Sequence, residues 1–233
     1  SFRTQALIDS LSSKDSVSNI YIFTSMPNRY SYAKKVYAKK FEEIEVKGKK
    51  IKIFRSQSIQ HRNSFILQII SFIIFVFSCI RWSFGIKNNI NIIHATSSRF
   101  GTALLGFLLS SLLKVKINLD IRDIFSDSLI VLSKRNLFLK IFTNVIRKVE
   151  KYVFKNSHSI TYVSKGFHND LNINSKKNIL YIPNGIDKLF IEFSNCNFVK
   201  NSNPVEPFKV TYAGNIGYAQ GLHHTIPKLA KYF

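Results

Sequence analysis

Short apolar runs bounded by turn residues recur along the chain and predict six strand regions. Their residues are mostly aliphatic, β-branched and aromatic, and the regions are 19–24, 41–54, 91–94, 115–121, 159–163 and 178–182. The second region alternates around Gly48, as a hairpin or a single strand would. Three longer segments have apolar residues at helical spacing and predict helices over 2–11, 99–113 and 137–155.

Strands that alternate with helices are typical of βαβ units, which build a parallel sheet with buried strands. We therefore predict an α/β fold. The stretch from Asn195 to Pro207 is polar and contains two prolines, which predicts a linker. Beyond it, a strand-like run and a glycine-rich loop begin afresh at Phe208. The predicted organisation is a first domain over 1–194, a linker over 195–207 and the start of a second α/β domain over 208–233.

The segment from Phe65 to Ile80 is apolar except where Gln68 and Ser71 interrupt it, and it is shorter than the roughly 20 residues that span a bilayer. Three interpretations compete: a buried core helix, a helix in the membrane interface and a transmembrane span. The interfacial interpretation draws on Trp82 and on the neighbouring Arg81 and Lys87, which suit the depth of lipid headgroups. Its candidate interface residues are Phe65, Phe72, Phe75 and Trp82.

The chain has 34 Lys and Arg against 13 Asp and Glu, a net charge of +21. Such a charge attracts polyanions, among them anionic lipids and phosphorylated substrates. A base-composition bias that fills the surface with Lys is the competing explanation. The cations are scattered and form no nucleic-acid-binding pattern, so we expect no nucleic-acid partner. Cys79 and Cys196 lie far apart without ligand spacing, which indicates a reducing compartment and no metal site.

Polar residues at predicted strand ends are the candidates for chemistry, because open α/β sheets place ligands at the carboxyl edge. Arg122 and Asp123 follow one strand, and either Arg122 holds an oxygen or phosphate while Asp123 accepts a proton, or the two form a structural ion pair. His94 ends another strand, where it is a ligand contact or an ordinary structural residue. Ser164 ends a third and is placed to cap the helix that follows.

Two glycine-containing segments follow the last predicted strands. Asn184, Gly185 and Asp187 form a tight turn in which Gly185 takes a positive φ. The loop from Gly214 to Gly221 lies between an apolar run and a helical pattern. There, backbone N–H groups and the helix dipole favour a diphosphate, although close strand–helix packing is the alternative. The members of this candidate phosphate loop are Gly214, Asn215, Gly217, Gln220 and Gly221.

The string SITYVSKGFHNDL followed by KKNILYIPNGIDKLF resembles the end of the N-terminal domain in family 4 glycosyltransferases of the GT-B fold. VTYAGNIGYAQGL resembles the first strand and loop of that family's donor-binding domain, and INLDIRDIFSDSL resembles another of its segments. FTSMPNRY and FEEIEVKGKKIKIFR resemble the bacterial surface-polysaccharide branch, including N-acetyl-L-fucosamine transferases. The order of these motifs along nearly the whole chain carries the resemblance.

The resemblance implies two Rossmann-like domains and a glycosyltransferase of O-antigen or capsule biosynthesis. A nucleotide-sugar donor, expected to be UDP-linked, is the substrate, and no cofactor or metal is expected. The acceptor is a lipid-diphosphate-linked saccharide at the inner, cytoplasmic face of the plasma membrane. A first strand would precede residue 1 and most of the donor domain would follow residue 233, so this chain alone is expected to be inactive. Gln220 stands where many members have Lys, and Arg122 where the wider family often has His. The alternative is a non-catalytic, basic, membrane-peripheral module.

Overall fold

The computed structural model has a mixed α/β fold, which confirms the predicted fold class. The structure describes residues 2–27, 38–59, 64–97, 100–133, 137–168, 178–186, 190–192, 211–214 and 221–231. The chain divides into two compact units, Ser1–Asp187 and Lys188–Phe233. The predicted linker 195–207 lies outside the described residues.

The first unit contains two sheets rather than one. The smaller sheet has the order β1-β3-β2, with the bounds β1 Asn19–Ser25, β2 Phe41–Val46 and β3 Lys49–Ser56. β1 and β3 are parallel, whereas β2 and β3 are antiparallel. The two-residue turn of this hairpin consists of Lys47 and Gly48, both at positive φ. That backbone is the one a tight hairpin requires, so the hairpin interpretation of 41–54 is confirmed.

The larger sheet has the order β4-β5-β6-β7 and is parallel throughout, which confirms the predicted parallel sheet. Its strands are β4 Ile92–Thr96, β5 Lys116–Ile121, β6 Ser159–Tyr162 and β7 Asn178–Tyr181. β5 lies in the middle of the buried layer, where Ile117, Leu119 and Ile121 are 3% exposed or less. These three residues alternate with Lys116, Asn118 and Asp120, so they form one apolar face of β5.

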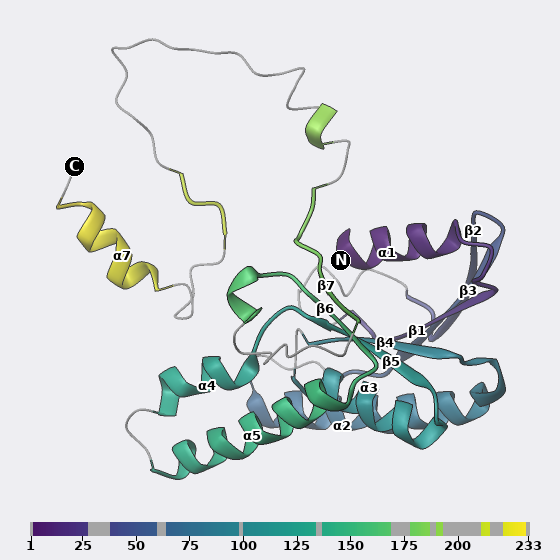
Figure 1. Ribbon diagram of the computed structural model, residues 1–233, viewed down its shortest axis with the longest axis horizontal. Helices are drawn as coiled ribbons and strands as arrows, with labels where there is room; N and C mark the ends of the chain where they lie inside the picture. The colour runs from purple at the N-terminus through teal and green to yellow at the C-terminus, as the bar shows by residue number, and fades with distance from the viewer. Residues whose placement is uncertain are drawn as a thin grey trace. The chain divides into compact units, whose positions relative to one another are not determined.

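Helices cover the sheets on two sides (Figure 1). On one side lie α2 Phe65–Gly85, α3 Phe100–Leu113 and α5 Leu137–Asn156, and on the other lies α1 Phe2–Ser12. α4 Phe125–Ser133 packs against α5 and was not expected from the sequence. Short 3-10 turns span Lys87–Asn89 and Lys165–His168.

The helix α2 packs one face against β1, β3 and α3. Ser64 begins it as the N-cap, with its hydroxyl oxygen accepting from the Leu67 N–H. Cys79 on its inner face is buried with Leu105 and Leu109 of α3, and Phe23 of β1 packs on the same cluster. The core-helix interpretation is therefore right for the inner face of α2. By length and composition its window Ile66–Gly85 would also cross a membrane, and only 11% of that window is buried.

The second unit contains one described helix of eight residues, α7 Leu222–Leu229. Gly221 is its N-cap, with φ +62° in the left-handed region. A side chain would be strained at that φ, so glycine suits the position. No residue of α7 is buried.

Candidate active site

The carboxyl ends of the four parallel strands meet at one edge of the larger sheet. Thr96 pairs in register with Asp120, Ile121 with Tyr162, and Tyr162 with Tyr181. The residues that follow these strands therefore lie along the same edge, and they include Ser97, Arg122, Ser164 and Ile182. This is the edge at which open α/β sheets bind ligands.

Ser97 organises this edge, although the sequence analysis did not single it out. Its backbone N–H donates to the Asp120 carbonyl at 2.9 Å. Its hydroxyl accepts from the Arg122 N–H at 2.9 Å, with a longer contact from the Asp123 N–H at 3.5 Å, and donates to the Asp123 carbonyl at 3.0 Å. Ser97 is 4% exposed. One buried hydroxyl thus fixes the backbone of both predicted catalytic residues. The available signal was the polar run that directly follows β4.

Arg122 is half-buried and Asp123 is exposed, so both side chains reach solvent at the sheet edge. The alternative interpretation paired them as a structural ion pair. Within the described part of the chain, no ion pair joins Arg122 to Asp123. Arg122 and Asp123 therefore present a guanidinium and a carboxylate on a loop whose backbone the Ser97 hydroxyl holds. A guanidinium binds phosphate or hydroxyl oxygens, and a carboxylate accepts a proton.

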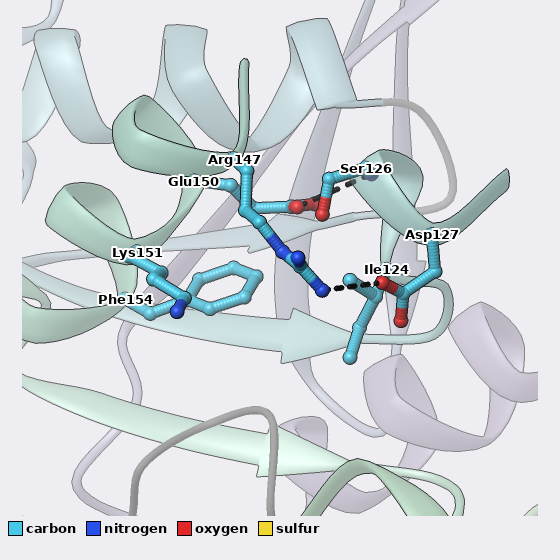
Figure 2. Close-up of a pocket in the computed structure, with 7 residues that line it drawn as sticks. All are labelled: Ile124, Ser126, Asp127, Arg147, Glu150, Lys151 and Phe154. Atoms are coloured by element: carbon cyan, nitrogen blue, oxygen red, sulfur yellow. Dashed lines mark hydrogen bonds and ion pairs between the residues drawn. The ribbon is translucent and has the colours of Figure 1, made fainter. Parts of the chain in front are cut away.

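The end of this loop is fixed by Glu150 of α5, a second residue that the sequence analysis missed. Its carboxylate accepts from the Phe125 and Ser126 N–H groups at 2.9 and 3.2 Å, which caps α4. Figure 2 shows the bond between Ser126 and Glu150. The Arg147–Asp127 ion pair lies beside it at 3.3 Å. These residues line a hollow of about 10 Å³, too small for more than one water and so not a substrate pocket. Glu150 is the sole acidic residue of α5, and that isolation was the signal.

Asp120 of β5 forms an ion pair with Arg3 of α1 and is also hydrogen-bonded to Thr161 of β6. The guanidinium donates to the two carboxylate oxygens at 2.8 and 3.1 Å, and Thr161 donates to one of them at 2.8 Å. Burial alone would raise the pKa of Asp120, but the hydrogen bonds from Arg3 and Thr161 outweigh it, so the pKa lies below its ordinary value. Arg3 also donates to the Ile182 and Pro183 carbonyls at 3.2 and 3.3 Å.

His94 does not end its strand, which corrects the prediction. β4 continues to Thr96 because Ala95 and Thr96 still pair with β5. The His94 Nδ1 lies 2.9 Å from Asn118 Nδ2, and the Asn118 Oδ1 accepts from the Ser159 hydroxyl. Asn118 therefore donates to a neutral imidazole. Burial of the ring lowers the pKa of His94, although the negative charge of Asp120 acts in the opposite direction. His94 is part of a strand-to-strand hydrogen-bond network rather than a residue at the sheet edge.

Ser164 lies at the end of β6, as predicted, and its hydroxyl accepts from the Gly166 N–H at 3.3 Å. Within the described residues the capped element is the 3-10 turn Lys165–His168. Gly185 does not take the predicted positive φ, since the described glycines with positive φ are Gly48 and Gly221. Arg3 binds the carbonyls of Ile182 and Pro183, just before this segment. Asn184 and Gly185 are exposed, and Asp187 lies outside the described residues.

The predicted phosphate loop belongs to the second unit and is described only in part. Gly214 is exposed and packs against the Tyr212 ring, and Gly221 caps α7 as stated above. Asn215, Gly217 and Gln220 lie outside the described residues. The placement of Gly221 at a helix N-terminus matches the glycine-loop prediction at that one position.

The predicted membrane-interface residues of α2 are turned toward the protein. The Trp82 ring lies 5.3 Å from Phe23 and 5.5 Å from Phe54, and Phe75 packs on the cluster around Cys79. Phe72 contacts Phe75 and approaches Gly101 of α3. The side chain of Phe65 lies outside the described set. These aromatics build the inner face of α2, because this face must cover the smaller sheet.

Among the described residues, no group of three or more His, Cys, Asp or Glu side chains is arranged to hold a metal ion. No protein-family model matches the chain, and no curated protein matches it. Among solved structures the chain is similar to a sucrose-phosphate synthase from Thermosynechococcus elongatus, with 12% sequence identity and a TM-score of 0.49. The alignment covers 83% of this chain and 91% of that chain. A likeness at this level assigns no activity or substrate to this chain.

Proposed function

We propose that this chain forms the acceptor side of a glycosyltransferase that uses a nucleoside-diphosphate sugar. The observation that carries the proposal is the Ser97-organised loop, which presents Arg122 and Asp123 at the carboxyl edge of a parallel sheet. The order of the family-like motifs along the sequence supports the same class. The two lines of support are independent, since one is geometric and the other is a sequence pattern.

In the proposed reaction an acceptor hydroxyl attacks the sugar carbon while the nucleoside diphosphate leaves. Asp123 accepts the hydroxyl proton, and Arg122 binds an acceptor oxygen or a phosphate oxygen. The leaving diphosphate gains negative charge, which backbone N–H groups at the N-terminus of a helix stabilise. The loop that ends at Gly221 has the residue types for this role. Gln220 contributes a hydrogen-bond donor there without a charge.

The finer proposal concerns the substrates. We assign the chain to family 4 of the GT-B fold and to the synthesis of O-antigen or capsule, with a UDP-linked donor such as UDP-N-acetyl-L-fucosamine. The acceptor is a lipid-diphosphate-linked saccharide, so the protein works at the inner, cytoplasmic face of the plasma membrane. These assignments rest on the sequence motifs. The net charge of +21 supports attraction to an anionic membrane and to diphosphates.

A donor-turnover assay on the full-length protein tests the proposal. The protein is incubated with a panel of UDP-sugars and a lipid extract, and both free UDP and glycosylated lipid are measured. We expect Asp123→Asn to lower kcat by about 10²-fold or more. Arg122→Ala should lower kcat/KM by roughly 10- to 100-fold. Lys39→Ala, an exposed change on the hairpin side of the first unit, is the control. Undiminished turnover in both site variants would refute the site assignment.

A non-catalytic, basic, membrane-peripheral module is the second candidate. The specific observation in its favour is the exposed apolar face of α2 and α5 together with the net charge. It predicts binding to anionic lipid without turnover of any donor in the panel. The same assay therefore separates the two candidates.

A further inference from the structure

The outward faces of α2 and α5 expose large apolar side chains. On α5, Leu137, Ile141 and Val145 follow one another every four residues and are 74%, 57% and 52% exposed. On α2, Ile66 and Phe77 are 69% and 67% exposed. Residues spaced this way lie on one helix face. Soluble monomers rarely expose contiguous apolar patches of this kind, and such patches mark interaction surfaces.

The exposed apolar residues lie mainly in the N-terminal half of each helix. α2 leads into β4 and α5 leads into β6, and both helices cover the same side of the sheets (Figure 1). A crossover helix runs opposite to the parallel strands that it connects. α5 lies in the connection between β5 and β6 of the larger sheet, so its N-terminal half lies toward the carboxyl edge that holds Ser97 and Arg122.

Most cations of the same two helices lie in their C-terminal parts, and Lys140 of α5 is the exception. Lys148, Lys151 and Lys155 are exposed on α5, and Arg81 is exposed near the end of α2. The one carboxylate of α5, Glu150, is buried and engaged with the start of α4. An apolar stretch beside an uncompensated basic stretch is the pattern of a helix that lies in the interface of an anionic bilayer.

We propose that the outward face of α5, together with that of α2, is a docking surface for an anionic lipid bilayer. Charge decides against a second copy of this chain as the occupant. Two such faces in parallel contact would bring the lysines of one α5 close to those of the other, and like charges across an interface are unfavourable. In antiparallel contact, the lysines of each α5 would lie against the apolar half of the other without a counter-charge. An anionic lipid surface neutralises the same cations.

Docking through this surface brings the carboxyl edge of the larger sheet near the lipid headgroups. Apolar side chains of α5 enter the interface first, and the lysines behind them reach headgroup phosphates. The value of this orientation for a lipid-linked acceptor rests on the proposed function. The docking itself does not rest on the proposed function, because it depends only on the exposed apolar residues and the lysines of the surface.

Co-sedimentation of the full-length protein with vesicles tests the docking surface. Vesicles of phosphatidylcholine alone are compared with vesicles of equal parts phosphatidylcholine and phosphatidylglycerol. Ile141→Gln/Val145→Gln should weaken binding to the anionic vesicles at least about tenfold. Gln keeps helix propensity, so the helix itself is retained. The matched control is Ile44→Gln/Leu180→Gln, which changes two exposed apolar residues of β2 and β7.

A second pair of variants tests the charge. Lys148→Gln/Lys155→Gln should weaken binding to anionic vesicles about tenfold or more and reduce its dependence on salt. Lys39→Gln/Lys40→Gln is the matched control, with two exposed lysines changed beside the hairpin. Equal loss in test and control variants would overturn the assignment to α5. A wild-type dimer in sedimentation velocity that Ile141→Gln/Val145→Gln dissociates, without vesicle binding, would overturn it in favour of self-association.

The docking surface and the proposed function fail separately. Vesicle binding that depends on α5, without turnover of any donor, would keep the docking surface and refute the glycosyltransferase. Turnover of a donor without vesicle binding would keep the glycosyltransferase and refute the docking surface.

Discussion

The Arg3 guanidinium and the Asp120 carboxylate form a two-pronged ion pair, at 2.8 and 3.1 Å, between residues 117 positions apart. Asp120 is 4% exposed, whereas the side chain of Arg3 is 22% exposed. The pair joins the start of α1 to the middle strand of the larger sheet. Since Arg3 also binds the carbonyls of Ile182 and Pro183, it ties three distant segments together.

Replacing either partner of this pair should destabilise the protein, and the two losses should not be additive. Asp120→Asn and Arg3→Met should each lower the free energy of unfolding by roughly 1–3 kcal/mol, because each leaves one polar partner unsatisfied. The double variant should lose less than the sum of the two. Urea denaturation of the four proteins measures the coupling. Strict additivity would contradict a direct interaction.

The same pair predicts a dependence of stability on acid. The pKa of Asp120 is lower in the folded protein than its ordinary value of 3.8. Its contribution is therefore fully present above that value and is lost as the pH falls through the folded pKa. Asp120→Asn should remove this part of the acid limb and lower the unfolding free energy at neutral pH by about the amount of the denaturant measurement. An unchanged slope of unfolding free energy below pH 4 in this variant would be evidence against the assignment.

Glu150 belongs to α5 and caps the N-terminus of α4, so it should contribute to the stability of the protein. Glu150→Ala removes the acceptor for two N–H groups at the start of α4 and should cost about 1–3 kcal/mol. Glu150→Gln keeps one acceptor oxygen and should cost less. Thermal and urea unfolding check the order of the two variants. Glu192, an exposed acid of the second unit, gives the control change Glu192→Ala. A Gln variant as unstable as the Ala variant would indicate that α4 is held otherwise.

Gly106 lies where α3 comes close to the sheet. A Cβ at this position would collide with the Ala95 side chain of β4, so Gly106→Ala should lower stability by about 1–3 kcal/mol. Gly85 of α2 has nothing within 4 Å of such a Cβ and no positive φ. Gly85→Ala should therefore change stability by no more than about 1 kcal/mol, in the stabilising direction. Urea denaturation of both variants distinguishes the steric collision at Gly106 from the general effect of replacing a helical glycine by alanine.

Cys79 should be inert in the folded protein. It is 2% exposed, and burial raises the pKa of its thiol to about 12. Since the thiolate is the reactive form, Cys79 should resist a maleimide reagent at neutral pH until the protein unfolds. Mass spectrometry of the labelled peptides follows this residue alone. Rapid labelling of Cys79 under native conditions would show that α2 separates from α3.

Hydrophobic periodicity predicted most elements of the first unit, because buried strands such as β5 and regular helices such as α3 show it in their own sequence. It did not predict α4, whose start depends on a carboxylate from α5. The candidate site shows the same limit. Arg122 and Asp123 were found because they follow a strand, whereas Ser97, Glu150 and Arg3 act through partners 25, 24 and 117 positions away. Such contacts form only when the strands are in register.

Ser97→Ala separates positioning from chemistry at the candidate site. The variant removes the hydroxyl that fixes the Arg122 and Asp123 backbone but leaves both side chains in place. If these two residues act on the substrate, a displaced loop should lower kcat by about 10- to 100-fold. The KM for the donor should change little if Arg122 binds the acceptor, and should rise if Arg122 binds a donor phosphate. Ser97→Thr keeps a hydroxyl and should recover most of the loss. Ser78→Ala removes a hydroxyl bonded within α2 and is the control. Full activity in Ser97→Ala, or equal losses in the Ala and Thr variants, would refute a positioning role for this hydroxyl.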